Sequence, residues 1–259
     1  MMKRTLVAAL LASSAAFAGA AQAQTVAALV GDDTLAMVDV KAAKVTKSVK
    51  ITGASGKILG IDVRPADGML YALAADGTVY TVDTAGKATM KSKLETTLAS
   101  GVMATVDFNP VADRLRVIGS DGMNLRANVD DGKVTTDGKL NFAEKDMHKG
   151  ETPMIVAGAY TNSVKGAKET TLFDVDSKIG ALIKQAPPND GVLSAVGKFG
   201  VTASSYAFDI VTMGDKNAGY LMAGDTLYSV SLETGKATSV SKIGGVTGAV
   251  RDIAIMPAM

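Results

Sequence analysis

The sequence has no cysteine and no tryptophan, one histidine, and only 5% aromatic residues among its 259 residues. Without cysteine no disulfide bond can form, so packing and hydrogen bonding must stabilise the fold. A single histidine, His148, cannot build a histidine-based metal site, and no Gly-x-Ser-x-Gly motif supplies a serine nucleophile. Few aromatic rings are available to stack on a sugar. Enzymatic activity is therefore uncertain, and the composition argues against it.

The chain also lacks an excess of either charge, because 27 basic residues are balanced by 26 acidic ones. Proteins that bind nucleic acid or anionic membranes usually carry a basic surface. The sequence therefore predicts no nucleic-acid partner. After the N-terminal region, no segment is apolar over the roughly 20 residues that a membrane-spanning helix needs, so we expect no membrane span.

The N-terminus has the order of features found in a secretory signal peptide. Lys3 and Arg4 precede an apolar run over residues 6–18, and Ala21-Gln22-Ala23 follows it. The run is too short to span a bilayer, and the small-x-small triplet is a typical cleavage site. We expect residues 1–23 to be a signal peptide, residues 24–259 to form a single domain, and the mature protein to be periplasmic or secreted.

A sequence pattern recurs along the chain with a period near 45 residues. Each copy consists of a short apolar run, a polar turn and a second run rich in Thr, Val and Ala. The copies lie at residues 34–46, 78–89, 124–135 and 226–238. Their matching residues, Lys44, Lys87, Lys133 and Lys236, lie 43, 46 and 103 residues apart, which corresponds to one, one and two repeats. Such a period, with several short strands per repeat, is typical of β-propeller blades.

A second series of residues sets the phase of the repeat. An aspartate flanked by apolar residues precedes each hairpin, at Asp62, Asp107, Asp209 and Asp252, and Ala159 takes the same place in the remaining repeat. These segments are predicted to be the innermost strands of the blades. The chain begins with a second strand and finishes with a first strand, so the C-terminal strand should close the ring. We therefore expect an all-β protein, a five-bladed propeller. The alternative is six blades, with a degenerate copy in residues 139–200.

Several segments resemble a bacterial exported family, the domain of unknown function (DUF) 4394. The resemblance rests on Asp107-Phe108-Asn109-Pro110-Val111-Ala112-Asp113-Arg114-Leu115-Arg116-Val117 and on Ala186-Pro187-Pro188-Asn189-Asp190-Gly191. Two shorter runs, Ala159-Tyr160-Thr161-Asn162 and Gly122-Met123-Asn124-Leu125-Arg126, are similar too. The resemblance covers essentially the whole mature chain and implies a propeller-like repeat fold. It implies no particular reaction, ligand or catalytic residue.

The aspartate series is the main candidate for chemistry, because closure of the ring should bring the four carboxylates towards one axis. Carboxylates that lie close together cannot all stay ionised without compensation. They can accept backbone N–H bonds from the next blade and latch the ring, or hold a hard cation such as Ca²⁺. They can also pair with nearby arginines (Arg64, Arg114, Arg116 and Arg251 are the candidates), or serve as catalytic groups.

From these patterns we expect an exported propeller that binds a small ligand or an envelope protein. The alternatives are a hydrolase or lactonase that uses the axial carboxylates, with or without calcium, and a structural envelope protein. No cofactor is expected, apart from calcium as that alternative. The candidate ligand-binding residues are Asp62, Arg64, Asp107, Asn109, Arg114, Arg116, Asn189, Asp190, Asp209 and Asp252.

Overall fold

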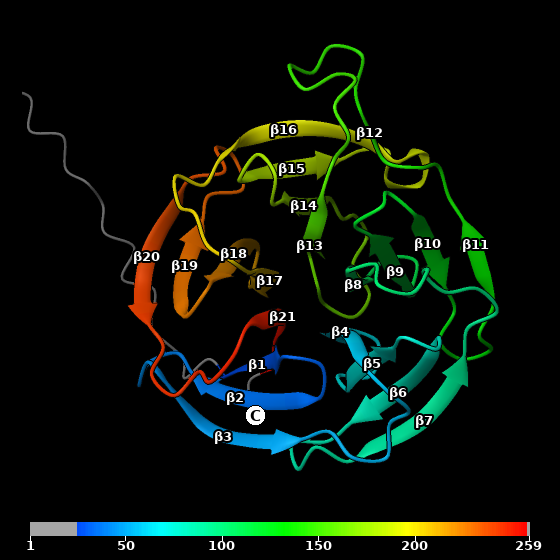
Figure 1. The fold of residues 1–259 in the computed structure, drawn as a ribbon. Helices are drawn as coiled ribbons and strands as arrows, with labels where there is room; N and C mark the ends of the chain where they lie inside the picture. The colour runs from blue at the N-terminus through cyan, green and yellow to red at the C-terminus, as the bar shows by residue number, and fades with distance from the viewer. Residues whose placement is uncertain (1–24, 258–259) are drawn as a thin grey trace, which may run out of the picture.

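The computed structural model describes residues 25–257, which form five β-sheets arranged as blades around a central axis (Figure 1). The described residues contain 21 strands and one short 3₁₀ helix, Pro188–Asp190. None of these residues forms a helix that is long and apolar enough to cross a membrane. The predicted all-β propeller is confirmed.

Each blade is an antiparallel sheet of four strands that runs from the axis to the rim. Blade 1 contains β21 (Val250–Ile255), β1 (Thr25–Val30), β2 (Thr34–Asp39) and β3 (Lys44–Lys50). Blade 2 contains β4 (Ile58–Val63), β5 (Leu70–Ala74), β6 (Thr78–Val82) and β7 (Ala88–Lys93). Blade 3 contains β8 (Ala104–Asn109), β9 (Arg114–Gly119), β10 (Asn124–Ala127) and β11 (Val134–Thr136).

The last two blades follow the same order. Blade 4 contains β13 (Ile155–Tyr160), β14 (Leu172–Asp176), β15 (Ala181–Gln185) and β16 (Val192–Lys198), with the short β12 (Asn141–Phe142) added in parallel to its outer edge. Blade 5 contains β17 (Tyr206–Met213), β18 (Lys216–Ala223), β19 (Thr226–Val230) and β20 (Ala237–Lys242). Residues 139–200 thus contribute a single blade and an extra edge strand, so the six-blade alternative is wrong.

The C-terminal strand completes the first blade, as the two sequence series predict. β21 pairs antiparallel with β1, with Val26 opposite Ile255 and Leu29 opposite Asp252. The strands β21, β4, β8, β13 and β17 then pack side by side around the axis. Both faces of each inner strand are covered by neighbouring blades, and all five are almost entirely buried, whereas the outer strands β3, β7 and β20 are mostly exposed. The inner strands are therefore rich in apolar residues on both faces, as buried strands are expected to be.

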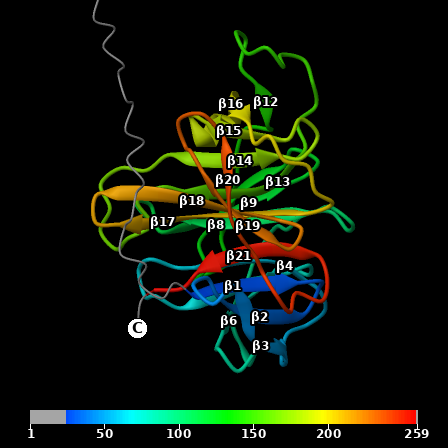
Figure 2. The ribbon, with the colours of Figure 1, turned by 90° about the vertical axis from the view of Figure 1, so that its left-hand side faces the viewer.

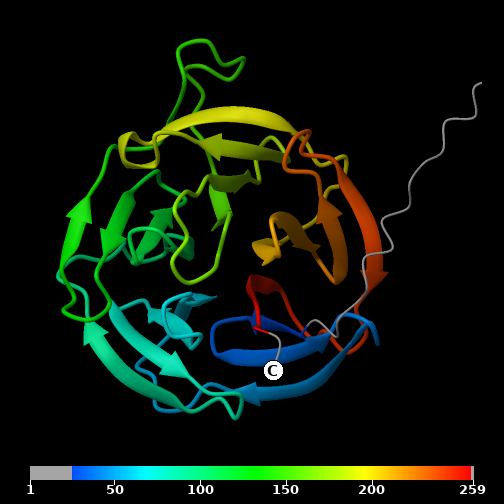
Figure 3. The same ribbon diagram turned by 180° about the vertical axis from the view of Figure 1, so that it is seen from behind.

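The turns between the first and second strands of blades 2–5, which we call the inner turns, lie at one end of the axis. They cover residues 64–69, 110–113, 161–171 and 214–215. In blade 1 the two chain ends take this place, where Met256 N–H donates to Thr25 O. Figure 2 shows the ring edge-on, with the turn between β17 and β18 on the side towards which the arrow of β21 points. Figure 3 looks onto this end of the ring.

The turns between the third and outer strands join the blades at the rim. Each turn shares a backbone hydrogen bond with the segment that follows the outer strand of the preceding blade, and all five junctions are closed in this way. The bonded pairs are Thr52–Gly86, Glu95–Gly132, Asn141–Gly191, Phe199–Ala237 and Gly244–Ala43. In these turns Gly86, Gly132, Gly191 and Gly235 have positive φ, and Ala43 takes the equivalent conformation in blade 1. The recurring glycine of the sequence pattern thus serves both the turn and the blade junction.

Candidate functional site

The four aspartates of the repeat lie on the inner strands, and each accepts a backbone hydrogen bond from the next blade. Asp252 Oδ2 accepts the Ile61 N–H at 2.9 Å, and Asp62 Oδ2 accepts the Phe108 N–H at 2.7 Å. Asp107 Oδ1 accepts the Tyr160 N–H at 3.0 Å, and Asp209 Oδ2 accepts the Ile255 N–H at 2.6 Å. Three of them also accept the N–H of the residue that follows in their own strand. The aspartates therefore accept backbone N–H groups of the next blade, which is one of the alternatives given by the sequence.

The junction between blades 4 and 5 has no such aspartate, because blade 4 carries Ala159 at this position. A pair of asparagines instead joins the inner turn of blade 4 to the start of β18 in blade 5. Asn162 N–H donates to Asn217 Oδ1, and Asn217 Nδ2 donates to Asn162 Oδ1, each at 2.8 Å. Asn162 has a φ of 58°, a conformation that asparagine tolerates better than most residues. Its place in the motif shared with the family therefore has a structural reason.

Three of the axial carboxylates are close enough to influence one another. Asp62, Asp107 and Asp209 each offer an oxygen atom within 4.8 Å of the other two. Burial raises the pKa of Asp62 and of Asp107 well above the usual range, and repulsion from neighbouring carboxylates raises it further. Burial raises the pKa of Asp209 to about 6 and that of Asp252 well above its usual value. At neutral pH the series therefore does not carry four full negative charges.

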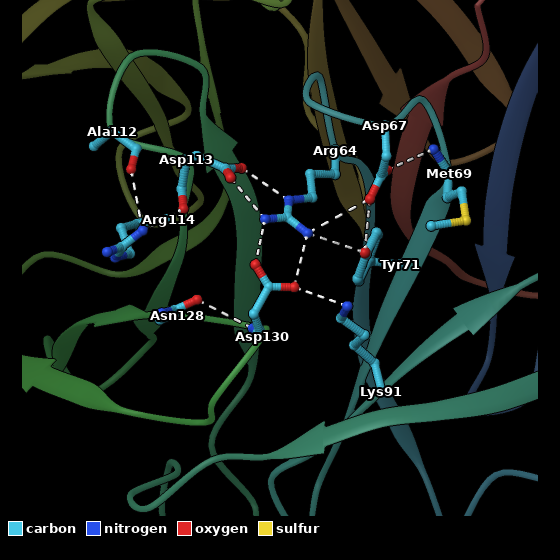
Figure 4. Close-up of polar contacts among 10 residues, drawn as sticks. All are labelled: Arg64, Asp67, Met69, Tyr71, Lys91, Ala112, Asp113, Arg114, Asn128 and Asp130. Atoms are coloured by element: carbon cyan, nitrogen blue, oxygen red, sulfur yellow. Dashed lines mark hydrogen bonds and ion pairs between the residues drawn. The ribbon is translucent and has the colours of Figure 1, made fainter.

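Among the described residues no arginine forms a hydrogen bond or ion pair with these carboxylates, although the charge of Arg251 lowers the pKa of Asp252. Arg251 pairs with Asp32, with Nη1 2.6 Å from Oδ1. Arg64 lies at the end of β4 but turns towards blade 3, as Figure 4 shows. Its Nη2 lies 2.6 Å from Asp113 Oδ2 and 2.8 Å from Asp130 Oδ2.

The Arg64 network joins blades 2 and 3. Arg64 is only 6% exposed, and it also donates to the Tyr71 hydroxyl at 3.3 Å, while Tyr71 in turn donates to Asp67. Lys91 reaches Asp130 from β7 at 2.8 Å. Hydrogen bonds from Arg64 and Lys91 hold the pKa of Asp130 well below its usual range. Every polar group of Arg64 is thus occupied by the protein itself.

A second buried arginine joins blades 3 and 4. Arg116 is 2% exposed and donates to the Tyr160 hydroxyl at 3.1 Å and to Asn189 Oδ1 at 2.8 Å, both from blade 4. Within blade 3 it donates to Asn124 Oδ1 at 2.9 Å and to Asp137 Oδ2 at 2.5 Å. Arg126 also binds Asp137, at 2.6 Å. Hydrogen bonds from the two arginines keep the pKa of Asp137 low despite its burial.

The remaining candidate residues lie near the surface. Asn109 Oδ1 accepts the N–H groups of Val111 and Ala112 and so shapes an inner turn. Arg114 donates to the carbonyls of Ala112 and Asp113 in the same turn. Asp190 is exposed in the 3₁₀ helix. The structure therefore groups Asp62, Asp107 and Asp209 on the axis and Arg116 with Asn189 between blades 3 and 4.

Several polar residues of these groups were not predicted from the sequence. Asp113, Asp130 and Asp137 are the anionic partners of the buried arginines, and none of them belongs to a repeating series. The second strand of blade 4 carries two further buried aspartates, Asp174 and Asp176. An aspartate within a strand of otherwise apolar residues is the one signal that could have marked the last two.

A Bacteroides thetaiotaomicron VPI-5482 structural genomics protein of unknown function has a similar fold, with a TM-score of 0.54 and 16% identity over 91% of this chain and 65% of that one. A protein of unknown function from Bacteroides caccae aligns with a TM-score of 0.44 and 12% identity, over 84% of this chain and 72% of that one. No curated protein matches the sequence. The family described as domain of unknown function (DUF4394) matches residues 34–254, in agreement with the motifs noted above, and the chain belongs to this family.

Proposed function

We propose that the protein is an exported β-propeller that binds a partner protein of the cell envelope through the end of the ring formed by the inner turns. One observation carries this proposal. Each of the four inner turns places a large apolar side chain in solvent at or next to the turn. These side chains are Met69, Val111, Val164 and Met213, which are 45%, 48%, 44% and 52% exposed.

The repetition of these side chains matters more than their number. Single exposed apolar residues are common on protein surfaces, whereas a group at one end of a fold is typical of an interaction site. The four residues come from four different blades, and the inner turns surround the axis at one end (Figure 3). Methionine adapts its shape to a partner more easily than other apolar residues do. This end of the ring therefore offers an adaptable apolar contact surface.

A protein partner is favoured over hydrolysis by how the axial carboxylates are used. Of the six carboxylate oxygens of Asp62, Asp107 and Asp209, five accept backbone N–H groups. Hydrolysis of a glycosidic bond needs two carboxyl groups that both reach the substrate. Arg64 and Arg116 are likewise occupied within the protein. The exposed apolar side chains have no such internal role.

The test is site-specific photo-crosslinking in the cell envelope of the host. A photoreactive residue at Val111 or Met213 is expected to form an adduct with the same partner protein. Met90 on β7 and Val240 on β20 are matched controls, since they are 61% and 46% exposed but lie on outer strands. Adducts that form equally at all four positions would contradict the proposal. Absence of any adduct would favour a structural role or a small ligand.

A second candidate function, cation binding, is favoured by the three oxygens that lie within 4.8 Å of one another. Oxygen ligands at carboxylates suit a hard cation such as Ca²⁺. Asp62, Asp107 and Asp209 would hold the ion, and its charge would offset their mutual repulsion. Asp107 Oδ2 is the one oxygen of the three residues for which the described residues supply no hydrogen bond. This oxygen is therefore the one that could bind a cation without losing a hydrogen bond.

Variants of Asp107 separate the latch from the cation site. Asp107→Asn keeps a side-chain oxygen that can accept the Tyr160 N–H. It removes a carboxyl group whose pKa is raised by burial. Because the pKa of this carboxyl group is higher in the folded protein than in the unfolded chain, where it is near 4, the free energy of unfolding falls as the pH rises above about 4. We therefore expect Asp107→Asn to be at least as stable as the wild type at pH 7. Asp107→Ala should be less stable than Asp107→Asn by about 1–3 kcal/mol, because the Tyr160 N–H loses its acceptor.

The same proteins are melted with EDTA and with excess Ca²⁺. If the ion binds, the wild type gains about 2.7 kcal/mol at a hundredfold excess over the dissociation constant, and both variants lose this gain. If Ca²⁺ leaves the wild-type melting temperature unchanged, the cation function is excluded. If Asp107→Asn is as unstable as Asp107→Ala, the acceptor is not what matters and the latch explanation is wrong.

A further inference from the structure

A carboxyl group without any hydrogen-bond partner lies between blades 3 and 4. Asp174 on β14 is 0% exposed, and neither of its carboxylate oxygens has a partner among the described residues. It is opposite Gly158 on β13, and a Cβ atom placed on that glycine would lie 2.5 Å from Asp174 Oδ1. The side chain is therefore packed closely against backbone. An ionised carboxylate in such a place would lose its hydration and gain no hydrogen bond in return.

Asp176, two residues further along the same strand, shows the contrast. It is 1% exposed and lies on the same face of β14, but it accepts three backbone hydrogen bonds. The donors are the N–H groups of Met154, Lys178 and Ile179, at 3.0, 2.9 and 3.2 Å. Two aspartates that are both buried thus differ in their hydrogen bonds, because Asp176 accepts three and Asp174 accepts none among the described residues. Gln185 on the neighbouring strand β15 is paired with Leu172, two residues before Asp174, and its buried Oε1 also has no partner among the described residues.

The charged groups around Asp174 come from both blades. The positive charge of Arg116 on β9 lowers the pKa of Asp174, and the negative charge of Asp176 raises it. Arg116 is itself held by Asp137, which it shares with Arg126, and by the hydroxyl of Tyr160 on β13. Burial raises the pKa of Asp174 to about 8, and the positive charge of Arg116 opposes this shift only in part.

We propose that Asp174 is a proton-binding site, and that the junction between blades 3 and 4 stays closed only while this carboxyl group is neutral. When the proton leaves to solvent, the new carboxylate competes with Asp137 and Asn189 for Arg116. Arg116 is the cation that ties blade 3 to the loop at residues 186–191, through its bond to Asn189. Proton release therefore weakens this tie, and the junction opens at alkaline pH.

Thermal melts of three proteins across pH test the proposal. In the unfolded chain Asp174 ionises near pH 4, so its neutral folded form costs stability as the pH rises from about 4 to 8, and the cost is constant above that. Asp174→Asn is neutral at every pH. Its melting temperature should exceed that of the wild type by an amount that grows by roughly 3–5 °C per pH unit between pH 5 and 8. Asp176→Asn, the matched control, should be less stable than the wild type, because one side-chain oxygen replaces the two that accept backbone N–H groups.

A direct titration keeps the proposal testable if a variant does not fold. The ¹³C carboxyl resonances of the wild-type protein labelled at aspartate are followed from pH 5 to 9.5, and the spectrum of Asp174→Asn identifies the signal. We expect that signal to titrate above pH 7. After correction for the base catalysis that accelerates exchange at every amide, we also expect the amides of Ala186, Asn189, Asp190 and Gly191 to exchange with deuterium faster above that midpoint in the wild type, and not in Asp174→Asn. A signal that titrates below pH 5, or a stability difference that does not change with pH, would overturn the proposal. So would titration above pH 7 without faster exchange in this loop.

Discussion

Removal of residues 250–259 should leave a protein that no longer melts cooperatively. The deletion takes away β21, and with it the buried side chains of Val250, Ile253 and Ile255. At about 1.5–3 kcal/mol for each buried aliphatic side chain, these three alone approach the net stability of a domain, about 5–15 kcal/mol. Two hydrogen bonds that latch β21 to its neighbours are lost as well, from the Ile61 N–H of blade 2 to Asp252 and from the Ile255 N–H of β21 to Asp209.

Circular dichroism melts of the deletion and of a matched control measure the effect. The control removes only residues 257–259, which follow the last strand, and it should melt like the full-length protein. If the longer deletion melts within a few degrees of the full-length protein, closure of the ring by β21 does not stabilise the fold.

Gly132→Ala should destabilise the protein far more than Gly166→Ala. Both glycines have a positive φ, 78° and 81°, so alanine is strained at either position by about 1–2 kcal/mol. A Cβ atom at Gly132 would also lie 2.1 Å from the carbonyl oxygen of Lys93, whereas nothing lies within 4 Å of one at Gly166. The clash falls at the rim junction where Glu95 N–H donates to Gly132 O. Overpacking of this kind adds about 1–3 kcal/mol.

Urea unfolding of the two variants gives the comparison. The difference between them isolates the blade junction, because the backbone conformation at the two glycines is nearly the same. Equal losses of stability would mean that the contacts at the rim between blades 2 and 3 accommodate the added methyl group without loss of stability. The recurring glycine would then be needed only for the conformation of the turn.

The architecture could be predicted from the sequence because the contacts that define it recur. The lysine-containing turns repeat because every blade meets its neighbour at the rim in the same way. The aspartates repeat because four inner strands need the same acceptor for a backbone N–H of the next blade. Even the gap in the series, Ala159, was visible. The asparagine pair that replaces this aspartate, Asn162 and Asn217, could not be predicted, because the contact between them is made at one blade junction and does not repeat.

The polar groups between the blades could not be predicted for the same reason. Arg64 binds Asp113 and Asp130, which lie 49 and 66 residues away, and each contact is made once in the molecule. Because Arg64 follows Asp62 by two residues, the sequence suggested that it pairs with an axial carboxylate, but its side chain turns to the neighbouring blade 3. Asp174 was missed because an aspartate in a buried strand has no pattern that tells whether it is satisfied. Sequence periodicity predicts the contacts that recur from blade to blade. Contacts that are made once in the molecule can be identified only from the structure.

The division of blade 1 between the two ends of the chain also imposes an order on biosynthesis. Val26 meets Ile255 and Leu29 meets Asp252, so residues more than 220 positions apart must find each other. Pairings over such distances slow folding. Since a nascent chain emerges N-terminal end first, β1 waits with an unpaired inner edge while the later blades assemble. The strand β21, the last of the described strands along the chain, therefore sets the moment at which the ring becomes one cooperative unit, and a chain that has emerged only as far as residue 249 would be an open arc of blades.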